Sequence, residues 1–108
     1  IPVLAVRVQV PDMENLRSLA DLLKSRMGSG VILLAAVMED KVSFVATITK
    51  DLLARGLHAG NLVKDVAKIT SGGGGGRPDM AQAGGKNPAK LEEALSQTYS
   101  FVKKQLLH

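Results

Sequence analysis

The sequence predicts an α/β domain in which helices pack against a mixed sheet of about four to five strands. Stretches with the two-residue alternation of apolar side chains typical of strands lie between stretches with the three- and four-residue spacing of amphipathic helices. The length of 108 residues suits one hydrophobic core, so we expect residues 1–108 to form a single domain. The composition, 45% hydrophobic and 22% charged, is that of an ordinary globular protein.

The first strand and the first helix are both marked by boundary residues. Between Pro2 and Pro11, apolar residues alternate with more polar ones, which predicts a strand with one buried face. Asp12 is expected to cap a helix over residues 13–27, whose apolar residues recur every three or four positions. Gly28 is expected to end this helix, because glycine readily adopts the left-handed conformation that often follows a helix.

The next two strands are expected to form a hairpin. The uninterrupted apolar run VILLAAVM, residues 31–38, is typical of a strand that is covered on both faces in the middle of a sheet. Residues 39–41 are polar and predict a turn. Alternating apolar residues over positions 42–49 then predict a strand that returns antiparallel to the previous one.

The second half of the chain is expected to be richer in helix. Thr49 is placed to cap a short helix over residues 50–55, and a longer helix is expected over residues 59–70. Residues 80–83 fit one short strand at the edge of the sheet. Asn87 followed by proline is a strong start signal for the last helix.

Composition restricts the function. No apolar run reaches the roughly 18 residues that a membrane span needs, so no membrane partner is expected. The chain has no Cys and two His, so we expect neither disulfides nor a metal site, and the lack of Cys favours the cytoplasm. Fourteen Lys and Arg against ten Asp and Glu give a net charge of +4, which fits either a polyanion-binding surface or an ordinary solvated one. The chain starts at Ile1 rather than Met, and we interpret it as a piece of a longer protein.

Residues 71–86, SGGGGGRPDMAQAGGK, are expected to form a glycine-rich loop inside the domain. The stretch fits neither the Walker motif nor the dinucleotide-binding fingerprint, because its glycines have the wrong spacing for both. Too few residues follow it to form a second core, which excludes an interdomain linker. Two interpretations stay open: a surface whose bare backbone contacts phosphates, or a turn that another piece of backbone approaches closely. The nearest basic residues are Lys64, Lys68, Arg77 and Lys86.

The segment GGGGGRPDMAQAGGK, preceded by HAGNLVKDVAKIT, resembles the globular C-terminal domain of bacterial alanyl-tRNA synthetases, within the DHH-associated nucleic-acid-binding domain family. The resemblance extends over essentially the whole chain. It implies a noncatalytic tRNA-binding appendage that contacts the outer corner, or elbow, of tRNA and assists aminoacylation and editing by the parent enzyme. It further implies that ATP and zinc serve the parent enzyme rather than this domain, that other domains of the parent chain are partners, and that some members form homodimers.

The resemblance and the nearby charges together define a predicted nucleic-acid site without catalytic residues. His58 stands where the family pattern suggests a Lys, and the Asp-His-His tripeptide of catalytic relatives is absent from the sequence. Phe44 and Phe101 fall on stripes expected to face the core, which leaves few aromatic rings for stacking on bases. Recognition is therefore expected to depend on phosphate, ribose and shape. The predicted site comprises Lys64, Lys68, Gly72, Gly73, Gly74, Gly75, Gly76, Arg77, Met80, Gln82 and Lys86.

Two alternative functions stay open. The domain could be the nucleic-acid substrate-binding half of a DHH-type phosphoesterase, which the N-terminal motifs of the parent chain would reveal. It could also be a module that mainly builds dimers, with the glycine stretch packed on a partner. Light scattering with and without RNA distinguishes this module from a tRNA-binding domain.

Overall fold

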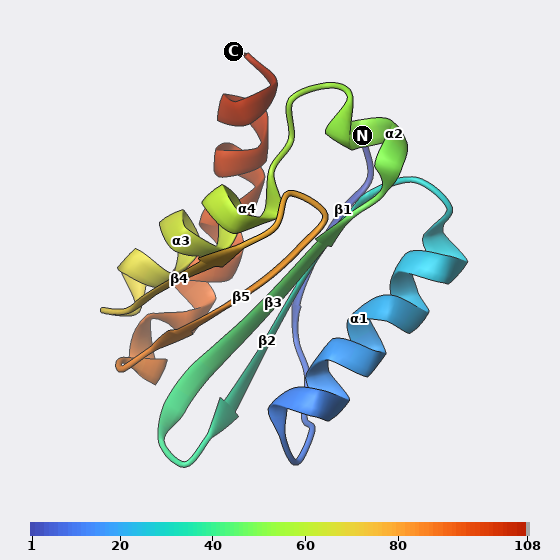
Figure 1. Cartoon of the computed structure of the whole chain (residues 1–108). Helices are drawn as coiled ribbons and strands as arrows, with labels where there is room; N and C mark the ends of the chain where they lie inside the picture. The colour runs from blue at the N-terminus through green and yellow to red at the C-terminus, as the bar shows by residue number, and fades with distance from the viewer. Residues whose placement is uncertain (108) are drawn as a thin grey trace.

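The computed structural model describes residues 1–107, which form one five-strand sheet with helices on both faces (Figure 1). The strands are β1 (Val3–Arg7), β2 (Val31–Met38), β3 (Lys41–Ile48), β4 (Gly73–Gly76) and β5 (Met80–Gly85). Their order across the sheet is β1-β2-β3-β5-β4. β1 is parallel to β2, whereas the other neighbouring strands are antiparallel. The predicted fold class, a single α/β domain with a mixed sheet, is therefore confirmed.

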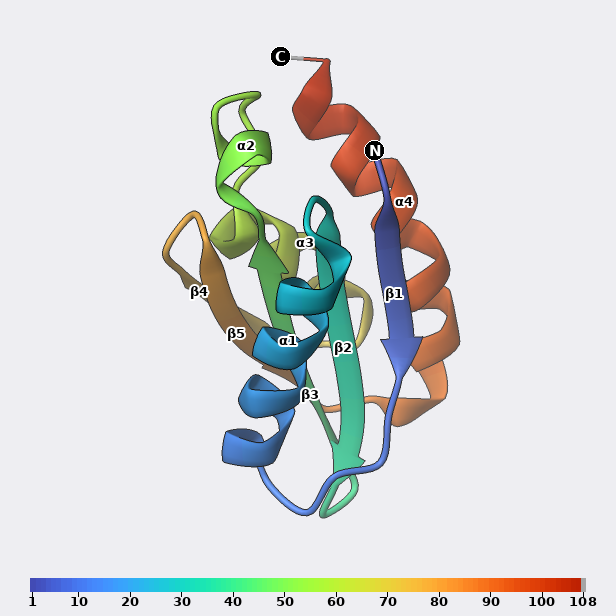
Figure 2. The ribbon, with the colours of Figure 1, turned by 90° about the vertical axis from the view of Figure 1, so that its right-hand side faces the viewer.

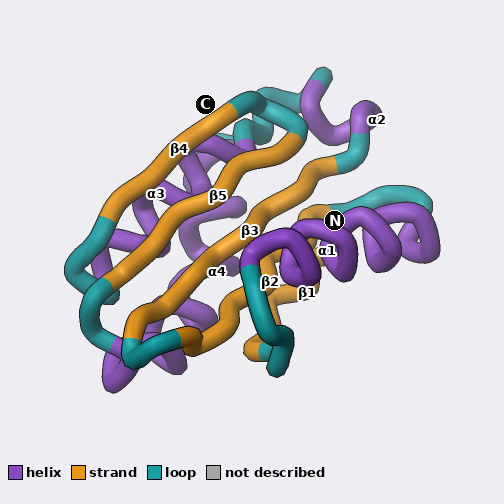
Figure 3. Tube along the Cα trace, turned by 60° about the horizontal axis from the view of Figure 1, so that its bottom comes forward, coloured by secondary structure: helices purple, strands orange, loops and turns teal. Residues whose placement is uncertain are grey.

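The helices give the domain three layers (Figures 2 and 3). α1 (Met13–Met27) covers one face of the sheet over β2 and β3, and α3 (Ala59–Ile69) and α4 (Leu91–Leu106) cover the other. The short α2 (Lys50–Leu53) follows β3, and the 3₁₀ turn η1 (Pro88–Lys90) leads into α4. Within the described residues, no helix combines the length and the apolar character that a bilayer crossing requires.

A hydrophobic cluster lies on each face of the sheet. On the side of α3 and α4, the fully buried Phe44 of β3 packs with Leu62 and other residues of α3. On the side of α1, Leu34 and Val45 pack with Leu16 of α1. Successive residues of a strand point to opposite faces, so the all-apolar β2 contributes to both clusters, as its sequence predicts.

Most predicted boundary residues act as expected. The Oδ1 atom of Asp12 accepts a hydrogen bond from the Asn15 amide at 2.9 Å, and this bond lowers the pKa of the Asp12 carboxyl. Gly28 ends α1 at a φ of 77°, in the left-handed region. At the start of α3, Nδ1 of His58 accepts a hydrogen bond from the Asn61 amide at 3.1 Å. His58 therefore caps α3.

The prediction that the Thr49 side chain caps α2 is wrong. Its hydroxyl accepts a hydrogen bond from the Gly30 amide at 3.0 Å and donates one to the Asp51 carboxylate at 2.6 Å. Asp51 also accepts a hydrogen bond from the Ser29 hydroxyl, and the bonds from Ser29 and Thr49 lower the pKa of the Asp51 carboxyl. The Thr49 side chain thus joins the start of α2 to the segment between α1 and β2.

The glycine-rich segment 71–86 forms a β-hairpin rather than the predicted loop. β4 and β5 pair antiparallel, with Gly73 opposite Gly84 and Gly76 opposite Ala81. Residues 80–83 do lie in a strand, β5, as predicted. Its predicted place at the edge of the sheet is wrong, because β5 lies between β3 and β4 and the glycine strand β4 is the edge. Glycine is disfavoured in strands by its own propensity, so a strand of four glycines has to come from its pairing and packing.

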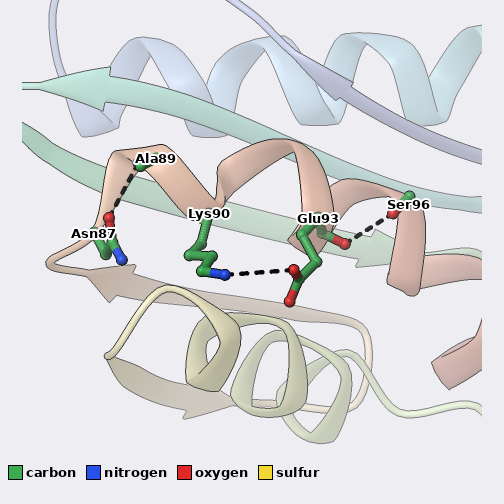
Figure 4. Close-up of polar contacts among 5 residues, drawn as sticks. All are labelled: Asn87, Ala89, Lys90, Glu93 and Ser96. Atoms are coloured by element: carbon green, nitrogen blue, oxygen red, sulfur yellow. Dashed lines mark hydrogen bonds and ion pairs between the residues drawn. The ribbon is translucent and has the colours of Figure 1, made fainter.

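The last helical segment starts at the predicted Asn-Pro pair (Figure 4). Oδ1 of Asn87 accepts a hydrogen bond from the Ala89 amide at 3.2 Å. Lys90 and Glu93 form an exposed ion pair at 3.7 Å, and the Glu93 carbonyl accepts a hydrogen bond from the Ser96 hydroxyl at 3.0 Å. Asn87 therefore begins the segment one 3₁₀ turn before α4 itself.

Candidate nucleic-acid interface

The edge strand β4 has one face packed against the protein and one open face. Gly74 pairs with Ala83, which is buried in the cluster on the α3 side. A Cβ atom on Gly74 would collide with both the side chain and the backbone of Ala83. Gly73 and Gly75 project to the opposite face of the sheet, and a Cβ atom on either would meet nothing within 4 Å.

Other glycines on the α3 side are explained by close packing of backbone on backbone. A Cβ atom on Gly60 of α3 would lie 2.6 Å from the carbonyl oxygen of Gly76. A Cβ atom on Gly72 would collide with the backbone of Gly84. At Gly60, α3 approaches the hairpin to a distance that only a residue without a side chain permits.

The two interpretations of the glycine run therefore apply to different residues. Close approach of neighbouring backbone accounts for Gly72, Gly74 and Gly76. In contrast, the exposed Gly73 and the partly buried Gly75 leave room for a side chain on the outward face of β4. Because β4 is the outermost strand, its free edge also carries backbone polar groups that have no strand partner.

The predicted lysines lie on the other side of β4, on the exposed surface of α3. Lys64 and Lys68 are one helical turn apart and both are exposed. Together with Lys104 of α4, they line a shallow hollow of about 280 Å³ between the two helices, here called the α3–α4 groove. Its lining is completed by Asn61, Asp65, Phe101 and Gln105. Within residues 1–107, no carboxylate lies within ion-pairing distance of these three ammonium groups.

Two hydrogen bonds hold the walls of the α3–α4 groove together. The backbone amide of His58 donates to Oε1 of Gln105 at 2.9 Å, and Nε2 of Gln105 donates to the His58 carbonyl at 3.2 Å. Because His58 caps α3 and Gln105 lies near the end of α4, this reciprocal pair fixes one helix relative to the other.

Three further predicted residues lie around β5 and the tip of the hairpin. Arg77 is exposed at the tip, where its side chain forms an ion pair with Asp79 at 3.3 Å. Met80 is partly buried against the cluster on the α1 side. Gln82 is exposed on the same face as Gly75, and its Oε1 accepts a hydrogen bond from Arg17 of α1 at 3.3 Å.

Lys86 lies at the opposite end of the hairpin. Its backbone amide donates to the Thr70 carbonyl at 2.8 Å, at the point where α3 ends. Its side chain lines a small depression together with Lys41 and Ser43 of β3. Lys86 is thus separated from Arg77 by the length of β4.

The structure brings together some of the predicted residues and separates others. Lys64 and Lys68 share the α3–α4 groove, whereas the open glycines share a face with Gln82 on the α1 side of the sheet. A single ligand that touches both sets has to pass around the edge of β4. Sequence reasoning missed Lys104 and Arg17, since both are ordinary helix-surface residues until the packing of the helices is known. Among the described residues, no three His, Asp or Glu side chains gather as they would around a metal ion.

Comparison with known proteins identifies the family of this domain. The profile of the DHHA1 domain matches residues 1–104, so the chain belongs to the DHHA1 domain family. The C-Ala domain of Aquifex aeolicus alanyl-tRNA synthetase, known from a crystal structure, has 34% sequence identity and a TM-score of 0.83, over 93% of this chain and 89% of that one. The chain therefore has the fold of the C-terminal domain of an alanyl-tRNA synthetase, as the resemblance implies.

Full-length relatives point to the same enzyme. The alanine–tRNA ligase of Desulforamulus reducens is 60% identical over 106 residues, and that of Bacillus subtilis is 57% identical over 106 residues. Each alignment covers 98% of this chain but 12% of the relative. The chain thus spans about an eighth of the length of these relatives.

Proposed function

We propose that this domain is a noncatalytic tRNA-binding appendage of an alanyl-tRNA synthetase. It contacts the outer corner, or elbow, of tRNA through phosphates, ribose and shape, and thereby assists aminoacylation and editing by the rest of the enzyme. The domain needs no cofactor of its own, since ATP and zinc serve other parts of the parent enzyme, which works in the cytoplasm. Alanine specificity comes from those other parts, because the elbow is similar in most tRNAs.

The observation that carries this proposal is a cationic helix surface next to a strand without side chains. Lys64 and Lys68 on α3 offer two exposed ammonium groups to backbone phosphates. Beside them, the glycine edge of β4 allows a ribose-phosphate chain to approach the protein backbone closely.

The few aromatic side chains support folded RNA over single strands. Phe44 is fully buried and Phe101 is partly buried, so neither offers a whole ring face to a base. Tyr99 is half exposed but lies on the β1 side of α4, away from the α3–α4 groove. Phe101 lines the α3–α4 groove but is partly buried, so stacking on bases, on which most single-strand binders depend, can contribute little there.

A filter-binding comparison tests the proposal. It uses this domain with alanine tRNA, a second folded tRNA and a single-stranded oligonucleotide, each at two salt concentrations. We expect similar affinity for both tRNAs, weaker binding of the oligonucleotide and a steep loss of affinity with salt. Absence of tRNA binding, or stronger binding of the oligonucleotide, contradicts the proposal. Light scattering of the same samples tests the alternative in which the domain mainly forms homodimers.

A further inference from the structure

We propose that the α3–α4 groove binds a phosphate group of the RNA backbone, with Lys104 of α4 as a contact outside the predicted site. This inference rests on the proposed RNA-binding function and adds to it a second helix. Lys104 lies forty residues from Lys64 in the sequence, and only the packing of α3 against α4 places both around one hollow.

The charges around the groove favour an anionic occupant. Three ammonium groups from two helices line the same hollow, and like charges at close range repel each other. Asp65 is the one carboxylate residue in the lining, and none of the three lysines forms an ion pair with another described residue. A phosphate that enters the groove relieves this repulsion and gains charge-assisted hydrogen bonds.

The size of the groove suits a small group such as one phosphate with its sugar. Its volume of about 280 Å³ lies at the lower limit of ordinary small-molecule sites, which take up roughly 300–1,000 Å³. The Gln105–His58 hydrogen bonds keep the two helices at this separation without a ligand. The backbone positions that carry the three lysines are therefore fixed in advance, and binding requires little rearrangement of the backbone.

The lining favours nucleic acid over an acidic protein segment. Phe101 is the one apolar residue that lines the groove, and the six others are polar or charged. Protein–protein interfaces are depleted in lysine and rich in buried apolar groups at their centre. Protein–nucleic-acid interfaces are polar and strongly positive, which matches this lining.

Neighbouring lysines on α4 provide a matched test. Lys104→Ala and Lys103→Ala each remove one positive charge from an exposed position of the same helix. Lys104 lines the α3–α4 groove, whereas Lys103 lines a separate depression with Ile1 and Tyr99. We expect Lys104→Ala to weaken tRNA binding and to reduce the slope of log affinity against log salt by about one. Lys103→Ala is expected to leave the slope close to that of the wild type.

The outcomes separate this inference from the proposed function. If the wild-type domain binds tRNA and the two variants are indistinguishable from each other, the groove assignment is wrong while RNA binding stands. If the wild type does not bind tRNA, both proposals fail. If polyglutamate competes with tRNA and Lys104→Ala abolishes polyglutamate binding alone, the groove serves an acidic polypeptide instead.

Amine-reactive footprinting supplies a test that needs no substitution. Acetylation of lysines in the free domain and in the tRNA complex is read out residue by residue by tandem mass spectrometry. We expect tRNA to protect Lys104 more strongly than Lys103. Equal protection of the two lysines, or protection of Lys103 alone, overturns the assignment.

Discussion

Alanine substitutions at two adjacent glycines should shift stability in opposite directions. The sequence alone does not distinguish the two positions, since both lie within one run of five glycines. In the structure, a Cβ atom on Gly74 collides with Ala83, whereas one on Gly75 enters open space. The packed and open faces of β4 therefore predict different results for the two positions.

The magnitudes follow from the two environments. Overpacking of a tight site costs about 1–3 kcal/mol, so Gly74→Ala should lower Tm by roughly 5–20 °C in a domain of this size. At Gly75 the backbone φ lies outside the left-handed region, so alanine restricts the unfolded chain without strain. Gly75→Ala should raise stability by about 0.4–1 kcal/mol, which increases Tm by a few degrees.

Thermal unfolding followed by circular dichroism measures both effects, and tRNA binding by the same samples completes the test. Under the proposed function, Gly75→Gln should keep the fold and weaken tRNA binding, because its side chain covers bare backbone. If Gly74→Ala and Gly75→Ala shift Tm equally and in the same direction, the assignment of the two faces of β4 is refuted.

Three further predictions concern the scaffold. Gln105→Ala removes both hydrogen bonds between the end of α4 and the start of α3. In urea titrations, this variant should lower the free energy of unfolding by about 1–3 kcal/mol. An unchanged free energy of unfolding would mean that these bonds do not hold the two helices together. The buried hydroxyl of Thr47 lacks a hydrogen-bond partner among the described residues, so Thr47→Val should preserve or raise Tm, and a clear drop contradicts this. The pKa of the Asp51 carboxyl is lower in the folded state than the unfolded value near 3.8. The Asp51 carboxylate therefore contributes to stability above the unfolded pKa, and this contribution is lost as the pH falls through the lower folded pKa. Asp51→Asn should therefore lose less stability than the wild type on acidification from about pH 5 to pH 2, and parallel curves would contradict the assignment.

The sequence predicts those parts of the fold that local patterns define. The apolar run of β2, the spacing in α1 and the Asn-Pro start of the last helix are local signals, and the structure confirms each one. The predictions that Asp12 caps α1 and that Gly28 ends it are confirmed for the same reason, because caps depend on backbone conformation within a single turn.

The glycine strand was missed because its cause is not local. Glycine favours no regular structure, so five in succession read as a loop. β4 becomes a strand because β5 pairs with it and α3 packs on it through Gly60. Thr49 shows the same limit, since its hydroxyl bonds to Gly30, a neighbour that only the tertiary fold supplies.

The sequence predicts only some residues of the candidate site. Lys64 and Lys68 lie on the exposed side of α3, as their four-residue spacing indicates. Their separation from Gly73 and Gly75 depends on which face of the sheet α3 covers. A one-residue shift in the register of β4 would turn these two glycines toward the α3 side. Lys104 joins them only through the packing of α4, which periodicity does not specify.

The salt dependence of tRNA binding tests the central claim most directly, namely that tRNA phosphates bind the lysine face of α3 beside β4. The double variant Lys64→Ala/Lys68→Ala is compared with Lys50→Ala/Lys103→Ala, which removes the same charge from exposed positions elsewhere. We predict that the first lowers tRNA affinity and reduces the slope of log affinity against log salt by about two, while the second leaves the slope nearly unchanged. Equal slopes for the two folded double variants would contradict the account.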